Sequence, residues 1–123
     1  MPSPNFVILY CAVPDTSVRF YADLLQRQPV EQSPTFSLFD LDNGLMLGLW
    51  ARTGVVPAPP QVGSAHELAL ALDSRDAVVR QHQRWEQRGL PVLLAPTDLD
   101  FGYTAVTADP DGHRFRVFAP TGG

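Results

Sequence analysis

The sequence predicts an α+β fold in which one β-α-β-β-β module occurs twice, and three observations support this fold class. A short apolar run opens each half of the chain, over residues 6–13 and again over 67–73. A helical pattern follows each run, and each half ends in a hairpin signal, Asn43-Gly44 in the first and Asp111-Gly112 in the second. The chain has 123 residues, of which 45% are hydrophobic, so a single domain over residues 1–123 can bury a real core. Because a half of about 60 residues would be marginal alone, we expect the halves to share a core or to pair with another chain.

The first module is predicted over residues 5–52. The apolar run at 6–13 is bounded by prolines, which indicates a buried strand. Apolar residues then recur at helical spacing over 15–27, and Pro29 ends that helix. Three further strands are expected over 30–32, 35–41 and 45–51.

The second module is predicted over residues 65–119, after a Pro/Gly-rich connector at 53–64. A strand at 66–72 is followed by a helix at 75–88, for which Gly89 is the expected C-terminal cap. The remaining strands are expected near 91–95, 102–108 and 113–119.

Composition excludes several classes of protein. The net charge of −4 and the pI of about 5.1 argue against a nucleic-acid partner. The sequence holds no run of 18 apolar residues, and its N-terminus lacks the basic and apolar regions of a signal peptide, so we expect neither a membrane span nor export. The single cysteine, Cys11, lies in an apolar run, which indicates a buried side chain in a cytoplasmic protein.

Alternation along two strands predicts a cavity wall. On the strand at 66–72, three leucines share one face, whereas Glu67 lies on the other face with two alanines. On the last strand, Arg116 shares a face with Arg114 and Phe118. A charge among small or apolar neighbours fills a core poorly and suits the wall of a cavity. The alternative is a solvent-exposed sheet face, which antiparallel sheets commonly have.

Two stretches, taken with this order of elements, resemble the vicinal oxygen chelate superfamily. Residues 13–25, Val-Pro-Asp-Thr-Ser-Val-Arg-Phe-Tyr-Ala-Asp-Leu-Leu, are similar to the family's V-x-D-x-x-x-S-x-x-F-Y-x-x-L-L stretch, and residues 109–112 are similar to its D-P-D-G hairpin. Val13 departs from the family's usual Asp. The resemblance covers about residues 5–119 and implies a glyoxalase/bleomycin-resistance-like fold, in which the two modules form an incomplete barrel and the protein is a homodimer.

Enzymes of that superfamily hold a divalent metal at four positions, which fall here on Phe6, Gly48, Glu67 and Arg116. Only Glu67 offers a side-chain ligand, and a catalytic site needs about three. The resemblance therefore implies a metal-free protein without a cofactor. A different register, in which His66 and His113 ligate, would restore a metal site.

Within the superfamily, the residues at 49–54, at 97–102 and from Asp109 to Val117 are similar to antibiotic-sequestering members, especially phenazine-resistance proteins. That resemblance implies a non-catalytic protein that sequesters a planar aromatic small molecule, an antibiotic, and so confers resistance. Trp50 would stack on the ligand, and Arg116 and Glu67 would orient its polar groups. The other expected wall residues are Phe6, Tyr10, Phe39, Gly48, Phe101 and Tyr103.

Two alternatives stay open at this point. One is a metal-dependent enzyme of the glyoxalase or dioxygenase type, with Glu67 and a histidine as ligands. The other is a partner module whose exposed sheet joins another protein.

Overall fold

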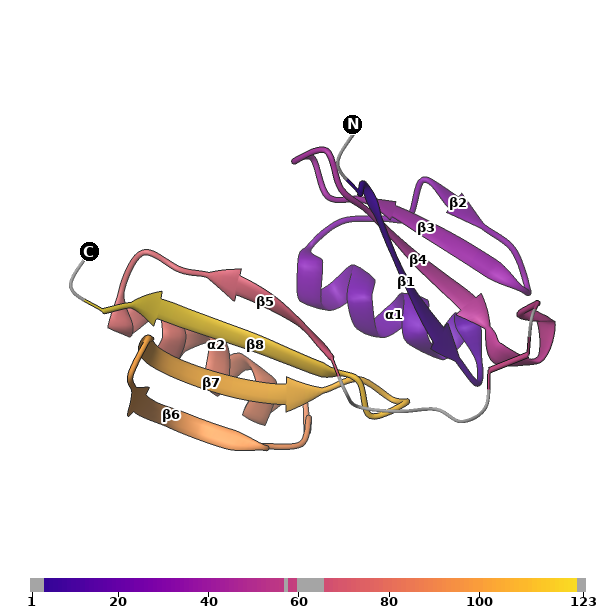
Figure 1. Cartoon of the computed structure of the whole chain (residues 1–123). Helices are drawn as coiled ribbons and strands as arrows, with labels where there is room; N and C mark the ends of the chain where they lie inside the picture. The colour runs from indigo at the N-terminus through magenta and orange to yellow at the C-terminus, as the bar shows by residue number, and fades with distance from the viewer. Residues whose placement is uncertain (1–3, 57, 60–65, 122–123) are drawn as a thin grey trace. The chain divides into compact units, whose positions relative to one another are not determined.

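The computed structural model describes residues 4–56, 58–59 and 66–121, and the chain divides into two compact units, Met1–Val62 and Gly63–Gly123. Residues 57 and 60–64 of the predicted connector, and the last two residues of the tail, lie outside the described residues. The elements of the first unit, in chain order, are β1 (Phe6–Cys11), α1 (Pro14–Leu25), β2 (Glu31–Gln32), β3 (Phe36–Asp40), β4 (Met46–Ala51) and a 3-10 turn, η1 (Arg52–Gly54) (Figure 1).

The second unit repeats the order of the first. Its elements are β5 (Glu67–Ala71), α2 (Arg75–Gln87), β6 (Leu94–Leu99), β7 (Gly102–Ala108) and β8 (Arg114–Pro120). The predicted α+β fold of two β-α-β-β-β modules is confirmed. Among the described residues, no helix has the length and hydropathy that a bilayer crossing requires.

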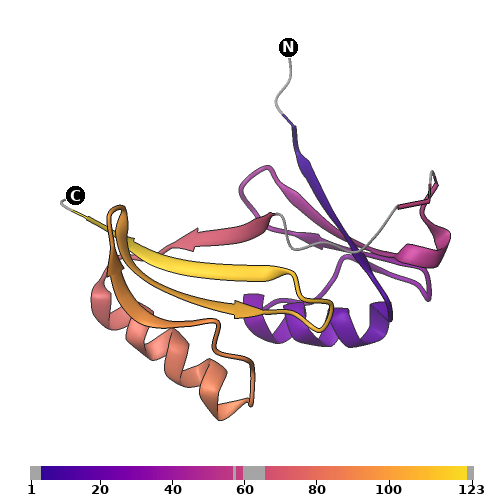
Figure 2. The same ribbon diagram turned by 60° about the horizontal axis from the view of Figure 1, so that its bottom comes forward.

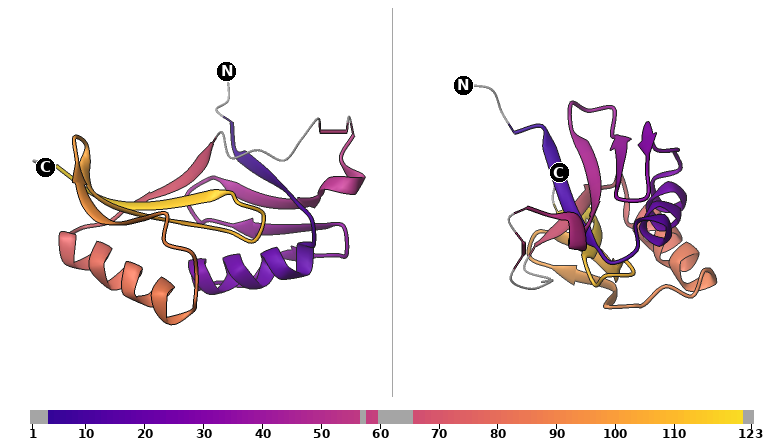
Figure 3. Two further views of the ribbon diagram at one scale, coloured as in Figure 1. Left: turned by 90° about the horizontal axis from the view of Figure 1, so that it is seen from below. Right: turned by 90° about the vertical axis from the view of Figure 1, so that its right-hand side faces the viewer.

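Each unit is a four-stranded mixed sheet with one helix on one face. The strand orders are β1-β4-β3-β2 and β5-β8-β7-β6, so the first strand of each module pairs in parallel with its last strand. Figure 2 shows α2 lying along one side of the second sheet, and the left view of Figure 3 shows each helix against its own sheet. In the described part of each unit, no helix packs on the opposite side, which we call the open face.

The helix-facing sides hold the core. In the first unit, the fully buried side chains on the sheet include Leu9, Leu47 and Leu49, which face Tyr21 and Val18 of α1. Cys11, which is 1% exposed, lies among them, as its apolar run predicts. The corresponding core of the second unit is formed by Val78 and Trp85 of α2 with Phe115, Val117 and Ala105 of the sheet.

Local sequence accounts for the helix ends. Pro14 begins α1, where its missing N–H costs no helical hydrogen bond. Ser74 caps α2 by accepting a hydrogen bond from the backbone N–H of Ala77. Gly89 follows α2 with a φ of +72°. Its N–H donates a hydrogen bond to the carbonyl of Glu86, and the N–H of Leu90 donates to the carbonyl of Trp85. These two bonds form a Schellman motif, so the prediction of Gly89 as the capping residue is confirmed.

Both predicted hairpins are present, but each loop has three residues. In the first, Leu41 donates its N–H to the carbonyl of Leu45, so residues 42–44 form the loop. In the second, Asp109 donates to the carbonyl of His113, so residues 110–112 form the loop, with Gly112 at a φ of +87°. In the second loop the N–H of Gly112 also bonds the carbonyl of Asp109, which is the pattern of a type I turn followed by glycine in the left-handed region.

The loop length decides which side chains share a face, because a shift of one residue in register turns a strand over. A two-residue Asn43-Gly44 turn would place Phe39 opposite Gly48. The three-residue loop instead pairs Phe39 with Leu47 and Leu38 with Gly48. Phe39 therefore lies on the helix-facing side and is 0% exposed, and its prediction as a cavity wall residue is wrong.

The length of the second hairpin loop decides the position of Tyr103 in the same way. In the second hairpin it pairs with Ala119, whereas Arg116 pairs with Val106. Odd-numbered residues of β7 therefore face α2, and the side chain of Tyr103 lies on that side, beneath the guanidinium of Arg75. Tyr103 was predicted as a wall residue, but the structure places it on the helix-facing side of the sheet instead.

The strand expected near 91–95 begins later, at Leu94, and extends to Leu99. Pro91 and Pro96 lack the N–H that a regular ladder uses, and the pairing with β7 shifts register between Leu94 and Thr97. Pro91 still takes part in the fold because its carbonyl accepts a hydrogen bond from Thr107 Oγ1 at 2.7 Å.

Gly102 marks a close approach of backbone to backbone. A Cβ atom built on it would clash with the carbonyl of Ala119 on β8. We expect Gly102→Ala to lower the free energy of unfolding by about 1–3 kcal/mol, since the strands would have to separate. Urea denaturation would measure the loss. Gly112→Ala would be a poor control, because the positive φ of Gly112 strains any other residue. The control is Ala108→Gly, which changes one methyl group on the same strand. A Gly102→Ala variant as stable as the wild type would contradict this packing.

Candidate functional site

The open face of the first sheet carries a row of three aromatic side chains. Trp50 of β4 pairs in register with Tyr10 of β1 and with Phe36 of β3, so the three side chains project from adjacent strands on the same face. The indole lies 6.4 Å from each neighbouring ring, with interplanar angles of 79° to Tyr10 and 84° to Phe36. Both contacts are edge-to-face, and neither ring stacks parallel to the indole. A planar molecule could therefore stack on Trp50 without displacing a stacked side chain.

Gly48 lies one row further along β4 on the same face. Gly48 is one of the predicted wall residues, but the ring of Phe36 fills the space that its missing side chain leaves beside the strand. A Cβ atom on Gly48 would lie 3.0 Å from Phe36 Cζ and 3.4 Å from Ile8 Cγ1. The glycine therefore lets the Phe36 ring lie close over the strand, and the room above Gly48 is not a ligand space in this conformation.

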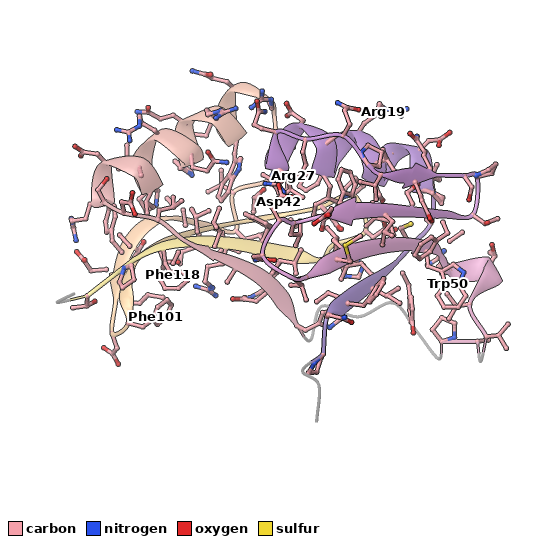
Figure 4. All side chains as sticks on the ribbon, turned by 90° about the horizontal axis from the view of Figure 1, so that it is seen from above. Arg19, Arg27, Asp42, Trp50, Phe101 and Phe118 are labelled. Atoms are coloured by element: carbon pink, nitrogen blue, oxygen red, sulfur yellow. The ribbon has the colours of Figure 1, made fainter. Side chains whose placement is uncertain are left out.

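The rest of this face is apolar and exposed along β1. Phe6 is 50% exposed and Ile8 is 41% exposed, and both project on the side of Tyr10 and Trp50. Figure 4 labels Trp50 at the end of its strand, next to η1. The face offers one half-buried indole and an apolar surface, without a charged side chain from β1 or β4.

The open face of the second sheet is built around an ion pair. Arg116 of β8 donates from Nε to Glu67 Oε2 at 2.6 Å and from Nη2 to Glu67 Oε1 at 3.2 Å. This side-on bidentate geometry is the strong form of an arginine–carboxylate pair. The side chains are only 17% and 30% exposed. Nη1 of Arg116 also donates to Thr104 Oγ1 at 3.3 Å, and that hydroxyl donates to the carbonyl of Val117.

Two phenylalanines flank the ion pair. The ring of Phe101 lies 5.6 Å from Arg116 Cζ and 5.7 Å from the ring of Phe118, which it meets edge-on. Figure 4 shows Phe101 and Phe118 side by side, from the turn before β7 and from β8. Phe101 is 47% exposed, so much of its ring is available to a ligand. The face thus combines a flat apolar surface with a fixed set of polar atoms.

A second arginine–carboxylate pair lies elsewhere on this unit. Arg75, at the start of α2, hydrogen-bonds both carboxylate oxygens of Asp98, at 2.6 and 3.2 Å, and covers the ring of Tyr103 at 3.9 Å. The hydrogen bonds lower the pKa of Asp98 and raise that of Arg75. Both groups are exposed to solvent, so this pair and Tyr103 belong to the outer surface around α2.

The four residues that the resemblance places at the superfamily's metal positions do not offer a set of metal ligands here. Phe6 and Gly48 have no donor atom, and both oxygens of Glu67 already accept hydrogen bonds from Arg116. Within the described ranges, no three His, Cys, Asp or Glu side chains are placed to share a metal ion. The rings of His66 and His113 lie 5.9 Å apart, but two imidazoles fall short of the roughly three ligands of a catalytic site.

Seven of the nine predicted site residues therefore lie on the open faces, and Phe39 and Tyr103 do not. Three residues of these faces that make contacts with the predicted ones were not themselves predicted: Phe36, Phe118 and Thr104. Phe118 lies two residues after Arg116 on the same strand, so alternation places both side chains on one face and Phe118 could have been predicted. Phe36 and Thr104 depend on the hairpin registers, which the sequence pattern alone left undecided.

Known proteins resemble the chain along almost its whole length. The family model described as Glyoxalase/Bleomycin resistance protein/Dioxygenase superfamily matches residues 3–117. The phenazine antibiotic resistance protein EhpR of Enterobacter agglomerans is 25% identical over 118 residues, which cover 94% of this chain and 90% of that protein.

Solved structures agree with this match. The solution NMR structure of a protein from Agrobacterium tumefaciens is 45% identical, covers 99% of this chain and 100% of its own, and superposes with a TM-score of 0.90. A glyoxalase/bleomycin resistance protein/dioxygenase from Nocardioides is 25% identical, with 100% and 87% of the two chains covered and a TM-score of 0.82. The chain, with its duplicated module and its match over residues 3–117, belongs to the glyoxalase/bleomycin resistance protein/dioxygenase superfamily.

Proposed function

We propose that this protein sequesters a planar aromatic small molecule, an antibiotic of the phenazine type, and confers resistance by lowering the concentration of free drug. It does so without metal, cofactor or bond cleavage, as a cytoplasmic homodimer. The observation that carries the proposal is the aromatic row on the first sheet, where Trp50 lies between two rings and is stacked by neither. The likeness to a phenazine antibiotic resistance protein supports the choice of ligand class.

The two open faces have separate roles in this proposal. Trp50 supplies a stacking surface, Tyr10 and Phe36 hold the indole in place, and Phe6 extends the apolar surface. On the second sheet, Phe101 and Phe118 provide apolar contact, and Arg116 with Glu67 orients the polar groups of the ligand. A ligand that is only stacked and oriented undergoes no chemical step.

The first test is a titration of metal-stripped protein with phenazine, followed by tryptophan fluorescence and repeated with added nickel, zinc, manganese or iron(II). We expect saturable quenching with the same Kd in every case, because no three potential metal ligands lie together among the described residues.

A Trp85→Phe variant sharpens the readout. Trp85 lies in the core of the second unit at 1% exposure, so its removal leaves Trp50 as the reporting indole. Binding that occurs only after a metal is added would contradict the proposal and favour a metal-dependent enzyme of the glyoxalase or dioxygenase type.

A further inference from the structure

The ion pair on the second sheet fixes which hydrogen bonds remain for a ligand. A guanidinium carries five N–H bonds. The contacts of Arg116 with Glu67 and Thr104 engage three of them. Among the described residues this leaves two N–H bonds, one on each terminal nitrogen, to donate to a ligand.

Glu67 keeps accepting capacity as well. A carboxylate has about four lone-pair positions, and the bonds from Arg116 use one on each oxygen. The pair therefore presents donors and acceptors side by side, next to the exposed ring of Phe101. A polar edge that both accepts and donates, such as a primary carboxamide on a flat ring, matches this arrangement.

The charges of the pair cancel where the ligand would bind. A ligand carboxylate that approached the free N–H bonds of Arg116 would also meet the negative charge of Glu67, and displacing Glu67 would leave that carboxylate partly buried and unpaired. Arg114 lies opposite Glu67 in the parallel pairing, on the same face. Its side chain is exposed, so water and salt screen its charge far more than that of the half-buried pair.

From these contacts we infer that Glu67 determines ligand specificity: it makes this face select uncharged planar molecules with a carboxamide-like edge and reject planar carboxylates. The inference rests on the proposed function and names the ligand class that the open face of the second sheet accepts. Arg116 would donate hydrogen bonds to either kind of ligand, and Glu67 determines whether a negatively charged ligand can bind there.

The experiment compares two probes of the same shape, phenazine-1-carboxamide and phenazine-1-carboxylate, by isothermal titration calorimetry at pH 7.5. We expect wild-type protein to bind the carboxamide about tenfold more tightly than the carboxylate. Glu67→Gln keeps the size of the side chain and one acceptor oxygen but leaves Arg116 with an uncompensated charge. In this variant we expect carboxylate affinity to rise about tenfold and the preference to disappear or invert.

Glu31→Gln is the matched control, because it removes the same charge from an exposed residue of β2 in the first unit and should leave the ratio of affinities unchanged. A wild-type protein that binds the carboxylate as tightly as the carboxamide would overturn the inference without any variant. So would a Glu67→Gln protein that keeps the wild-type ratio.

The failure of the proposed function has a different signature. If unsubstituted phenazine and both probes all fail to bind, the planar-ligand proposal is wrong and the inference falls with it. If phenazine binds and the two probes do not differ, sequestration stands and only the role of Glu67 is wrong.

Discussion

Replacing Phe39 with alanine should lower the free energy of unfolding by about 3–5 kcal/mol, the usual cost of removing a buried phenylalanine ring. The side chain is 0% exposed and lies on the helix-facing side of the first sheet, in register with Leu47. Its loss would leave a cavity between the sheet and α1 that close-packed neighbours can fill only in part. Urea denaturation followed by circular dichroism would give the change.

Phe6→Ala is the matched control, because it removes the same atoms from the other face of the same sheet. Phe6 is 50% exposed, so we expect a loss of about 1 kcal/mol or less. Equal losses for the two variants would contradict the register of the first hairpin. Retained stability in Phe39→Ala together with lost ligand binding would return Phe39 to the wall of the site.

The order of elements could be predicted from the sequence because each signal is local. Apolar runs, helical spacing, Ser74 and Gly89 at the ends of α2, and the glycine turns all act within a few residues of one another. The open faces could be predicted for the same reason, since Glu67 and Arg116 lie on largely apolar strands and alternation fixes their side.

Hairpin register could not be predicted in the same way. Asn43-Gly44 and Asp111-Gly112 are both typical of two-residue turns, yet each hairpin has one more residue in its loop. That single residue turns β3 and β7 over, which moved Phe39 and Tyr103 to the helix side. A glycine turn signal therefore predicts that a hairpin exists. It does not decide on which face of the sheet each side chain of the first strand lies.

Side-chain packing across strands was also beyond the sequence pattern. Gly48 suggests an open space when β4 is considered alone, whereas the ring that fills the space comes from β3. Thr104 likewise supports Arg116 only because β7 and β8 pair in the observed register. Both features depend on contacts between residues 12 apart in sequence, which no local pattern specifies.

In the proposed function, the side chains of the two open faces are expected to affect ligand binding in different ways. The aromatic row offers area and a π-face but few polar atoms, so it can hold many flat rings with similar strength. The Arg116–Glu67 pair offers little area but a fixed pattern of donors and acceptors, so we expect it to discriminate between ligands of the same shape. Variants of the first face should therefore change affinity for every planar ligand, and variants of Glu67 should change the ranking.

The strongest test of the first face is Trp50→Ala, for which we expect at least a tenfold weaker affinity for phenazine, in line with the roughly 1–3 kcal/mol that one aromatic stacking contact contributes to base binding. Calorimetry must supply the measurement, because the substitution removes the fluorophore. Trp50→Phe keeps an aromatic face in the same row, between Tyr10 and Phe36, and should recover most of the loss. Recovery by a ring, but not by alanine, would assign the effect to stacking. An unchanged affinity in Trp50→Ala, with a wild-type unfolding midpoint, would remove Trp50 from the site and with it the observation on which sequestration rests.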